Sequence, residues 1–163
     1  MQRHLQRSLS GSEVVVLASN NSENRLEAAT AMAPGSALAT RLPGAEPRTC
    51  LALRFGRTHR ENPARTPLLS CQLCDRGPRS TCESLLVGGQ VIGSVLVRHD
   101  SALTGHEEVR IRNSVAQAAP VLGNLRNLAL AEFRANNDSL TGLPNKRATD
   151  DTLKRMVAQA NRS

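Results

Sequence analysis

Two apolar segments joined by a Gly-Gly pair constrain the fold of this chain more than any other part of its sequence. Residues 81–87 and 90–98 are rich in apolar and β-branched side chains, and Gly88 and Gly89 stand between them. A two-residue turn needs positive φ angles, which glycine adopts without steric cost, so the pattern predicts a β-hairpin. One face of the second segment is entirely apolar, which predicts that the hairpin packs against a core.

A heptad pattern follows the hairpin. From Ile111 to Ala129, apolar residues recur at alternating spacings of four and three, the spacing of the a and d positions in a coiled coil. Thr104 and Glu107 have the spacing of a capping box in front of this pattern. Pro120 lies inside it, so we expect either a kink near residues 116–120 or two helices in series. The helix can pack on the sheet, form a homodimer that carries a signal, or do both on different faces. The seam residues are Ile111, Val115, Ala118, Leu122, Leu125 and Ala129.

The other elements have weaker signals. Residues 1–10 resemble the end of a helix, residues 14–18 read as a buried strand, and residues 25–32 fit either a strand or a short helix. Residues 34–67 hold five of the eight prolines, so we expect little regular structure there apart from a helix at 48–55. Together these elements predict an α+β fold, an antiparallel sheet flanked by helices with a long C-terminal helix.

Charge and composition bound the class of protein. The 163 residues carry a net charge of +7, and the aromatic residues are two Phe with no Trp or Tyr. The arginines are spread along the chain without aromatic stacking platforms, so we expect a solvated basic surface rather than nucleic-acid binding. The longest strictly apolar run, at residues 14–18, is far too short to span a membrane, and the N-terminus has no secretory pattern. We therefore expect a cytoplasmic protein.

Four cysteines form the candidate chemical site. Disulfides are rare in the cytosol, and Cys71 and Cys74 have the CxxC spacing of a metal chelate. With two more thiolates they could hold zinc tetrahedrally, and His59 is an alternative ligand. Three interpretations stay open: structural zinc, a redox- or nitric-oxide-responsive thiol group that includes an iron–sulfur cluster, and ordinary buried thiols. The four candidates are Cys50, Cys71, Cys74 and Cys82.

A motif near the C-terminus points to a family. Residues 138–147 read DSLTGLPNKR, in which the Asp can cap a turn, the Gly permits a bend and the Pro precedes a helix. This segment resembles the DxLTGLxNRR segment that opens the GGDEF domain of diguanylate cyclases. The matching positions are Asp138, Leu140, Thr141, Gly142, Leu143, Asn145 and Arg147.

The resemblance implies a signalling enzyme whose catalytic part lies outside this sequence. Diguanylate cyclases join two GTP molecules into cyclic di-GMP, using carboxylates that bind Mg²⁺. The sequence contains neither a GGDEF nor a GGEEF motif, so we expect this chain to have no catalytic residues and to stop before the active site. On this interpretation residues 134–163 are the linker and first helix of a GGDEF domain, and Mg²⁺ and GTP belong to the absent catalytic domain.

The preceding part resembles a GAF sensor domain. Residues 82–96 are similar to a "CvPLxaxGexxGxLxL" block of GAF domains found before GGDEF domains, and residues 50–59 to a "CxALRxGxxH" block of the same subgroup. Asn124, Leu125 and Arg126 stand near the position of an "ANLRLR" exit helix. The resemblance implies that residues 1–133 form a GAF-like sensor with a six-stranded antiparallel sheet, a dimerisation helix and a small-molecule ligand of unknown identity. The alternative is a stand-alone zinc- or small-ligand-binding GAF protein without cyclase activity.

Overall fold

The computed structural model describes residues 2–9, 12–20, 22, 24–33, 35–62, 64, 66, 68–74, 79–138 and 140–161. The chain forms two compact units, Met1–Gly123 and Asn124–Ser163, and the division falls inside a helix. The expected domain boundary after residue 133 stays a prediction, because it rests on family resemblance rather than on compactness.

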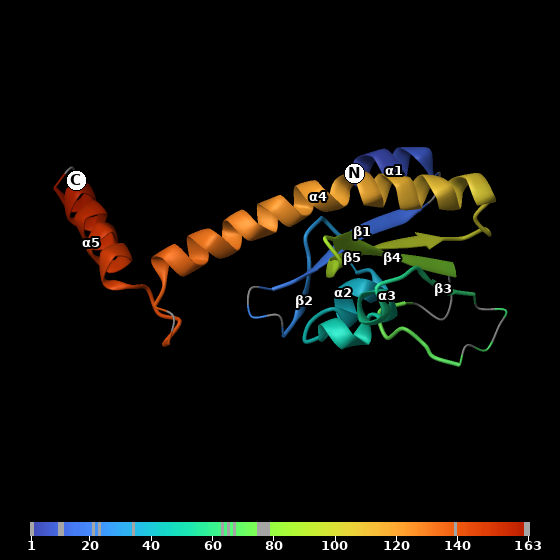
Figure 1. The fold of residues 1–163 in the computed structure, drawn as a ribbon, viewed down its shortest axis with the longest axis horizontal. Helices are drawn as coiled ribbons and strands as arrows, with labels where there is room; N and C mark the ends of the chain where they lie inside the picture. The colour runs from blue at the N-terminus through green and yellow to red at the C-terminus, as the bar shows by residue number, and fades with distance from the viewer. Residues whose placement is uncertain are drawn as a thin grey trace. The chain divides into compact units, whose positions relative to one another are not determined.

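The first unit is built on an antiparallel sheet with the strand order β2-β1-β5-β4-β3 (Figure 1). The predicted hairpin is confirmed, since the last two strands in sequence pair around Gly88 and Gly89, whose φ angles are +56° and +83°. The described residues contain five strands, whereas the resemblance implied six. The strands are β1 (Glu13–Ser19), β2 (Leu26–Ala28), β3 (His59–Glu61), β4 (Arg79–Val87) and β5 (Gln90–His99).

Helices cover both faces of this sheet (Figure 1). Alternate residues of β1 point to opposite faces, as the strand period requires. Val14 and Val16 pack in a core cluster with residues of the first and fourth helices, and Val15 and Leu17 pack in a second cluster with residues of the short helices. The α+β class is therefore confirmed. The helices of this unit are α1 (Gln2–Ser8), α2 (Ala37–Arg41), the 3₁₀ helix η1 (Pro47–Thr49), α3 (Leu51–Phe55) and the start of α4 (Gly105–Asn136).

The proline-rich part is more ordered than its composition predicted. The expected helix at 48–55 is present as η1 followed by α3, and the ambiguous segment 25–32 contains β2. Helix α2 was not predicted from the sequence. It begins after Ser36, whose side chain accepts a hydrogen bond from the Ala39 amide, and it buries Leu38 in the core. One cap and one buried leucine are thus enough to form a helix of five residues when tertiary packing supports it.

Helix α4 is continuous through Pro120. The predicted alternative of two helices in series is therefore wrong. Pro120 is exposed, so the carbonyl group that loses its partner can be hydrated and the helix can continue past it. Within the described parts of the chain, no helix is both long enough and apolar enough to cross a membrane.

The start of α4 has the predicted capping box. The Thr104 amide and hydroxyl donate to Glu107 Oε2 at 2.7 and 2.8 Å, and the Glu107 amide donates to the Thr104 hydroxyl at 3.3 Å. These bonds, first of all the one from the Thr104 amide, hold the pKa of the Glu107 carboxyl below its usual range.

The capping box therefore predicts that the stability of the start of α4 depends on pH. A lowered folded-state pKa contributes stability that is complete above the unfolded pKa and is lost as the pH falls through the folded pKa. We expect an NMR titration of Glu107 with a midpoint below that of an ordinary glutamate, together with faster amide exchange at the start of α4 below that midpoint. The Glu107→Gln variant should lose this pH dependence. An unshifted midpoint in the wild-type protein would contradict the prediction.

The second unit contains the rest of α4, a turn and α5 (Lys146–Ala160). Asp138 Oδ1 accepts hydrogen bonds from the Leu140 amide at 3.2 Å and from the Thr141 amide and hydroxyl at 3.0 Å. Gly142 has a φ of +68° and donates its amide to the Asp138 carbonyl at 2.9 Å. Asn145 caps α5 by accepting from the Ala148 amide at 2.9 Å. The local roles predicted for the aspartate and the glycine are confirmed.

A buried cluster of four cysteines as the candidate site

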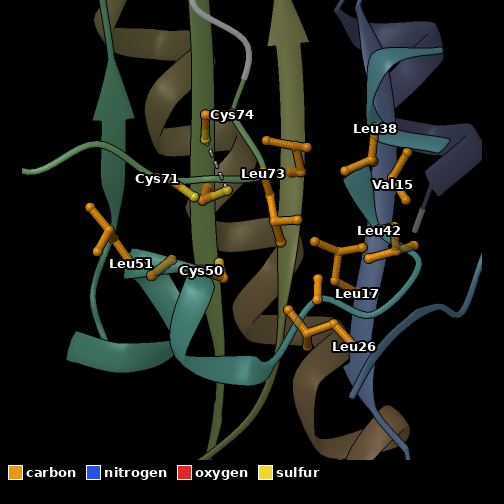
Figure 2. Packing of buried hydrophobic residues seen from close by; sticks show 14 residues of the cluster. Val15, Leu17, Leu26, Leu38, Leu42, Cys50, Leu51, Cys71, Leu73 and Cys74 are labelled. Atoms are coloured by element: carbon orange, nitrogen blue, oxygen red, sulfur yellow. Dashed lines mark hydrogen bonds between the residues drawn. The ribbon is translucent and has the colours of Figure 1, made fainter. Parts of the chain in front are cut away.

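All four cysteines belong to one buried core cluster, on the face of the sheet that α2 and α3 cover (Figure 1). Figure 2 labels three of them, Cys50, Cys71 and Cys74. Cys50 is the residue before α3, Cys71 and Cys74 lie in the segment between β3 and β4, and Cys82 lies within β4. All four are reduced and between 0% and 3% exposed. We call these four residues the cysteine cluster.

The sulfur atoms are close together. Those of Cys50, Cys71 and Cys82 lie within 4.8 Å of one another, which is close enough to hold a metal ion. Cys74 joins the group through a distance of 3.9 Å between its Sγ and that of Cys82, the dashed line in Figure 2. Three of the four predicted cysteines thus converge closely enough to hold a metal, and Cys74 contacts one of the three.

His59, the alternative ligand, makes a different contact. Its Nε2 lies 3.4 Å from Glu61 Oε1, and the same carboxylate oxygen accepts a hydrogen bond from the Cys71 amide. Glu61 is buried and holds the backbone at the start of the CxxC segment. On the other side of that segment, Arg41 donates to the Cys74 carbonyl at 2.8 Å. The histidine thus lies beside a residue that positions the cluster.

Two serine hydroxyls also face the cysteine cluster. Ser94 Oγ and Cys50 Sγ lie 3.4 Å apart and are hydrogen-bonded. Ser80 precedes Cys82 by two residues on β4 and therefore points to the same face. Its hydroxyl is buried without a hydrogen-bond partner among the described residues, and it lowers the pKa of Cys74, although other causes raise that pKa more.

Sequence reasoning missed Glu61, Ser80 and Ser94 as parts of the site. The available signal for Ser80 was its spacing of two from a cysteine in a predicted strand. Glu61 had the same spacing from His59. No local pattern marks Ser94, because its contact with Cys50 spans 44 positions of the sequence.

Hydrogen bonds among the four thiols shift their pKa values in opposite directions. Hydrogen bonds from Cys50, then from Cys74 and Cys82, hold the pKa of the Cys71 thiol well below its usual range. The bond with Cys71 in turn raises the pKa of Cys74 and that of Cys50. Bonds with Cys50, Cys71 and Cys74, together with burial, raise the pKa of Cys82. Within the cluster, ionisation of Cys71 is therefore favoured over ionisation of the other three thiols.

The residues of the predicted helix seam differ in burial along α4. Ile111 and Val115 are buried against the sheet together with Ala119. Ala118 and Leu122 are half-buried, whereas Leu125 and Ala129 are exposed. A groove of about 510 Å³ runs beside the half-buried positions. It is lined by Gln2, Arg3, Val16, Ala29, Thr30, Ala118, Val121 and Leu122.

A second hollow, of about 420 Å³, lies between β2 and α2. Its floor includes the apolar side chains of Leu26, Met32 and Leu42, and Arg25 and Glu27 stand on its wall. The small-molecule ligand that the family resemblance implied stays a prediction.

Comparison with known proteins identifies the fold. Neither a protein-family model nor a curated protein matches the sequence. A GAF domain/HD domain protein from Geobacter sulfurreducens has a similar solved structure, with a TM-score of 0.58 and 20% identity over 77% of this chain and 88% of that one. The chain has a GAF-like fold. A domain of a protein described as a two-component sensor histidine kinase, from Sinorhizobium meliloti, matches this GAF-like fold with a TM-score of 0.57 and 13% identity, over 77% and 87% of the two chains.

Proposed function

We propose that this chain is the regulatory GAF module of a diguanylate cyclase and acts on a GGDEF domain through α4. The main support is the continuity of this helix. It contacts the sheet through Ile111 and Val115, runs to Asn136, and ends two residues before the DSLTGLPNKR motif at Asp138. A change in how α4 packs on the GAF-like sheet therefore reaches the predicted start of the output domain along a single element.

The exposed part of α4 supports a dimeric mechanism. Val121, Leu125 and Leu128 are all exposed, and their spacings of four and three repeat the a and d spacing of a coiled coil. A second copy of α4 is the partner that this spacing fits, because these three exposed residues can then pair with their counterparts about a twofold axis. A cyclase that joins two GTP molecules held by two facing domains can be controlled by the geometry of such a dimer.

The solved relatives support a signalling role for the fold. One is named for a GAF and an HD domain together, and the other for a sensor kinase. The same fold thus accompanies different output domains, and the DSLTGLPNKR motif is what selects a GGDEF domain here. Mg²⁺ and GTP would bind that domain.

Insertions into α4 of the full protein test this proposal. Two residues inserted after Ala131 rotate the following segment by about 200°, whereas seven residues return it to within about 20° of its original phase. We expect the seven-residue insertion to keep the rate of cyclic di-GMP formation from GTP. The two-residue insertion should change that rate about tenfold, within the usual range of coupling between sites.

The seven-residue insertion is the matched control, because it lengthens the helix without changing its phase. Equal rates for both insertions would contradict transmission through α4. A full protein that makes no cyclic di-GMP under any condition would favour the stand-alone ligand-binding alternative.

A further inference from the structure

We propose that the cysteine cluster is a closed, structural site for one Zn²⁺ ion. This inference goes beyond the proposed signalling function and depends on the geometry, burial and surroundings of the four sulfur atoms. The zinc ion would attach the segment between β3 and β4 to the sheet.

The spacing of the sulfur atoms fits a tetrahedral zinc site. A Zn–S bond of about 2.3 Å in a regular tetrahedron places the sulfurs about 3.8 Å apart. The Sγ atoms of Cys74 and Cys82 lie 3.9 Å apart, and those of Cys50, Cys71 and Cys82 lie within 4.8 Å of one another. Cys74 lies outside this group of three, so its Sγ is more than 4.8 Å from at least one of the other sulfurs. The cluster must therefore contract on the Cys74 side for four ligands to reach one ion.

Burial distinguishes a structural site from a catalytic one. Catalytic zinc keeps a coordination position open for water or substrate, whereas structural zinc is enclosed by four protein ligands. Here four cysteines are available and each is almost completely buried. The ligand set is therefore complete without solvent.

The surrounding polar groups are suited to thiolates. The Ser94 hydroxyl is 3.4 Å from Cys50 Sγ, and the buried Ser80 hydroxyl, which has no partner among the described residues, lies on the same face of β4 as Cys82. A metal-bound thiolate accepts hydrogen bonds from such donors, which orient the ligands and tune the metal. The zinc site thus gives the orphaned hydroxyl of Ser80 a partner.

A dication would balance much of the charge that four ligand thiolates carry. Four buried thiolates without a cation would be very costly, and Zn²⁺ offsets two of their charges. The positively charged side chain of Arg41 lies next to the cluster through its bond to the Cys74 carbonyl. The arrangement resembles an anionic metal centre with a neighbouring cation.

The ion would join three separate segments. Cys50 lies between η1 and α3, the CxxC pair lies after β3, and Cys82 lies in β4. The CxxC segment has little other apolar anchoring, because Leu68 and Leu69 are exposed and Leu73 is the buried leucine between its cysteines. Metal coordination is thus the main cross-link of this segment.

Metal analysis of the whole chain, purified without oxygen or added chelator, tests the proposal. Atomic emission should find about one zinc per chain. Less than about 0.2 equivalents would overturn the proposal. Stoichiometric iron with acid-labile sulfide would overturn it as well, in favour of an iron–sulfur cluster.

Variants show whether the ligands are the predicted ones. Cys74→Ser should reduce the bound zinc at least fivefold, whereas Leu73→Ala is the matched control, since it removes a buried side chain from the same segment but no sulfur. Equal loss of zinc in both variants would contradict a ligand role for Cys74. If Cys74→Ser does not fold, cobalt substitution of the wild-type chain shows whether four cysteines bind the metal. Four thiolates give a more intense thiolate-to-cobalt charge-transfer absorption than three.

Discussion

Removal of the zinc ion that we propose for the cysteine cluster should lower the melting temperature of this protein by roughly 8–16 °C. An ion that binds only the folded state stabilises it by about 4 kcal/mol when its free concentration is about 1,000 times its Kd. In a chain of this size each kcal/mol corresponds to roughly 2–4 °C in the melting temperature. The effect arises because the cysteine cluster connects η1–α3, the CxxC segment and β4 only in the folded state.

Thermal unfolding followed by circular dichroism, with zinc or with excess chelator, measures this shift. The Cys74→Ser variant is the control, because it should melt at the same temperature in both solutions. Hydrogen exchange should localise the change to residues 68–74 and spare the β1–β5 pairing. Identical melting curves for the wild-type chain with and without chelator would contradict a stabilising metal.

Replacing Gly93 with alanine is expected to be the most damaging single substitution on the sheet. A Cβ atom at this position would lie 2.4 Å from the backbone oxygen of Leu17 and 3.2 Å from Leu85 Cδ1. The clash is with backbone, and Gly93 pairs with Ala18 in the β1–β5 ladder, so relief requires the central strands to separate. We expect a loss of at least ~3 kcal/mol in the free energy of unfolding.

Urea denaturation of the two alanine variants at Gly93 and Gly105 provides the measurement and its control. A Cβ atom at Gly105, at the start of α4, meets nothing within 4 Å, so Gly105→Ala should leave stability unchanged or raise it by up to about 1 kcal/mol. A Gly93→Ala variant within ~0.5 kcal/mol of the wild type would show that β1 and β5 pack differently from the structure described above.

The features that the sequence predicts well are those with local causes. The hairpin follows from Gly88 and Gly89 between two apolar segments, and the start of α4 follows from the pairing of Thr104 with Glu107. Asp138 holds its turn through bonds to residues two and three positions away. In each case the interacting groups lie within a few residues of one another, so the pattern contains the whole interaction.

The features that the sequence predicts poorly depend on tertiary contacts. Helix α2 is too short to be stable alone and forms because Leu38 is buried against the sheet. Strand β3 has three residues and exists through its pairing with β4. The effect of Pro120 on α4 depends on whether that side chain faces solvent, which the heptad spacing does not specify.

The candidate site also contains residues that the sequence marks and residues that only tertiary contacts reveal. The four cysteines and the CxxC spacing marked the candidate residues, but they left structural zinc, a redox-responsive group and ordinary buried thiols all open. The contributions of Glu61, Ser80 and Ser94 come from strand register and from a segment that returns to the sheet, so they required the structure. For the helix seam, the period alone could not separate Ile111, which packs on the sheet, from Leu125, which is exposed.

We propose that α4 transmits a signal through a symmetric dimer, and the molecular mass of the chain in solution tests this dimer. Sedimentation equilibrium of the chain at high micromolar concentration should give the mass of two chains. Leu125→Glu should give the mass of one, because it places a charge at an exposed seam position of α4 that is 58% accessible. Val109→Glu, at an exposed position of α4 outside the seam, should remain dimeric. A wild-type chain that sediments as a monomer at this concentration would contradict the account.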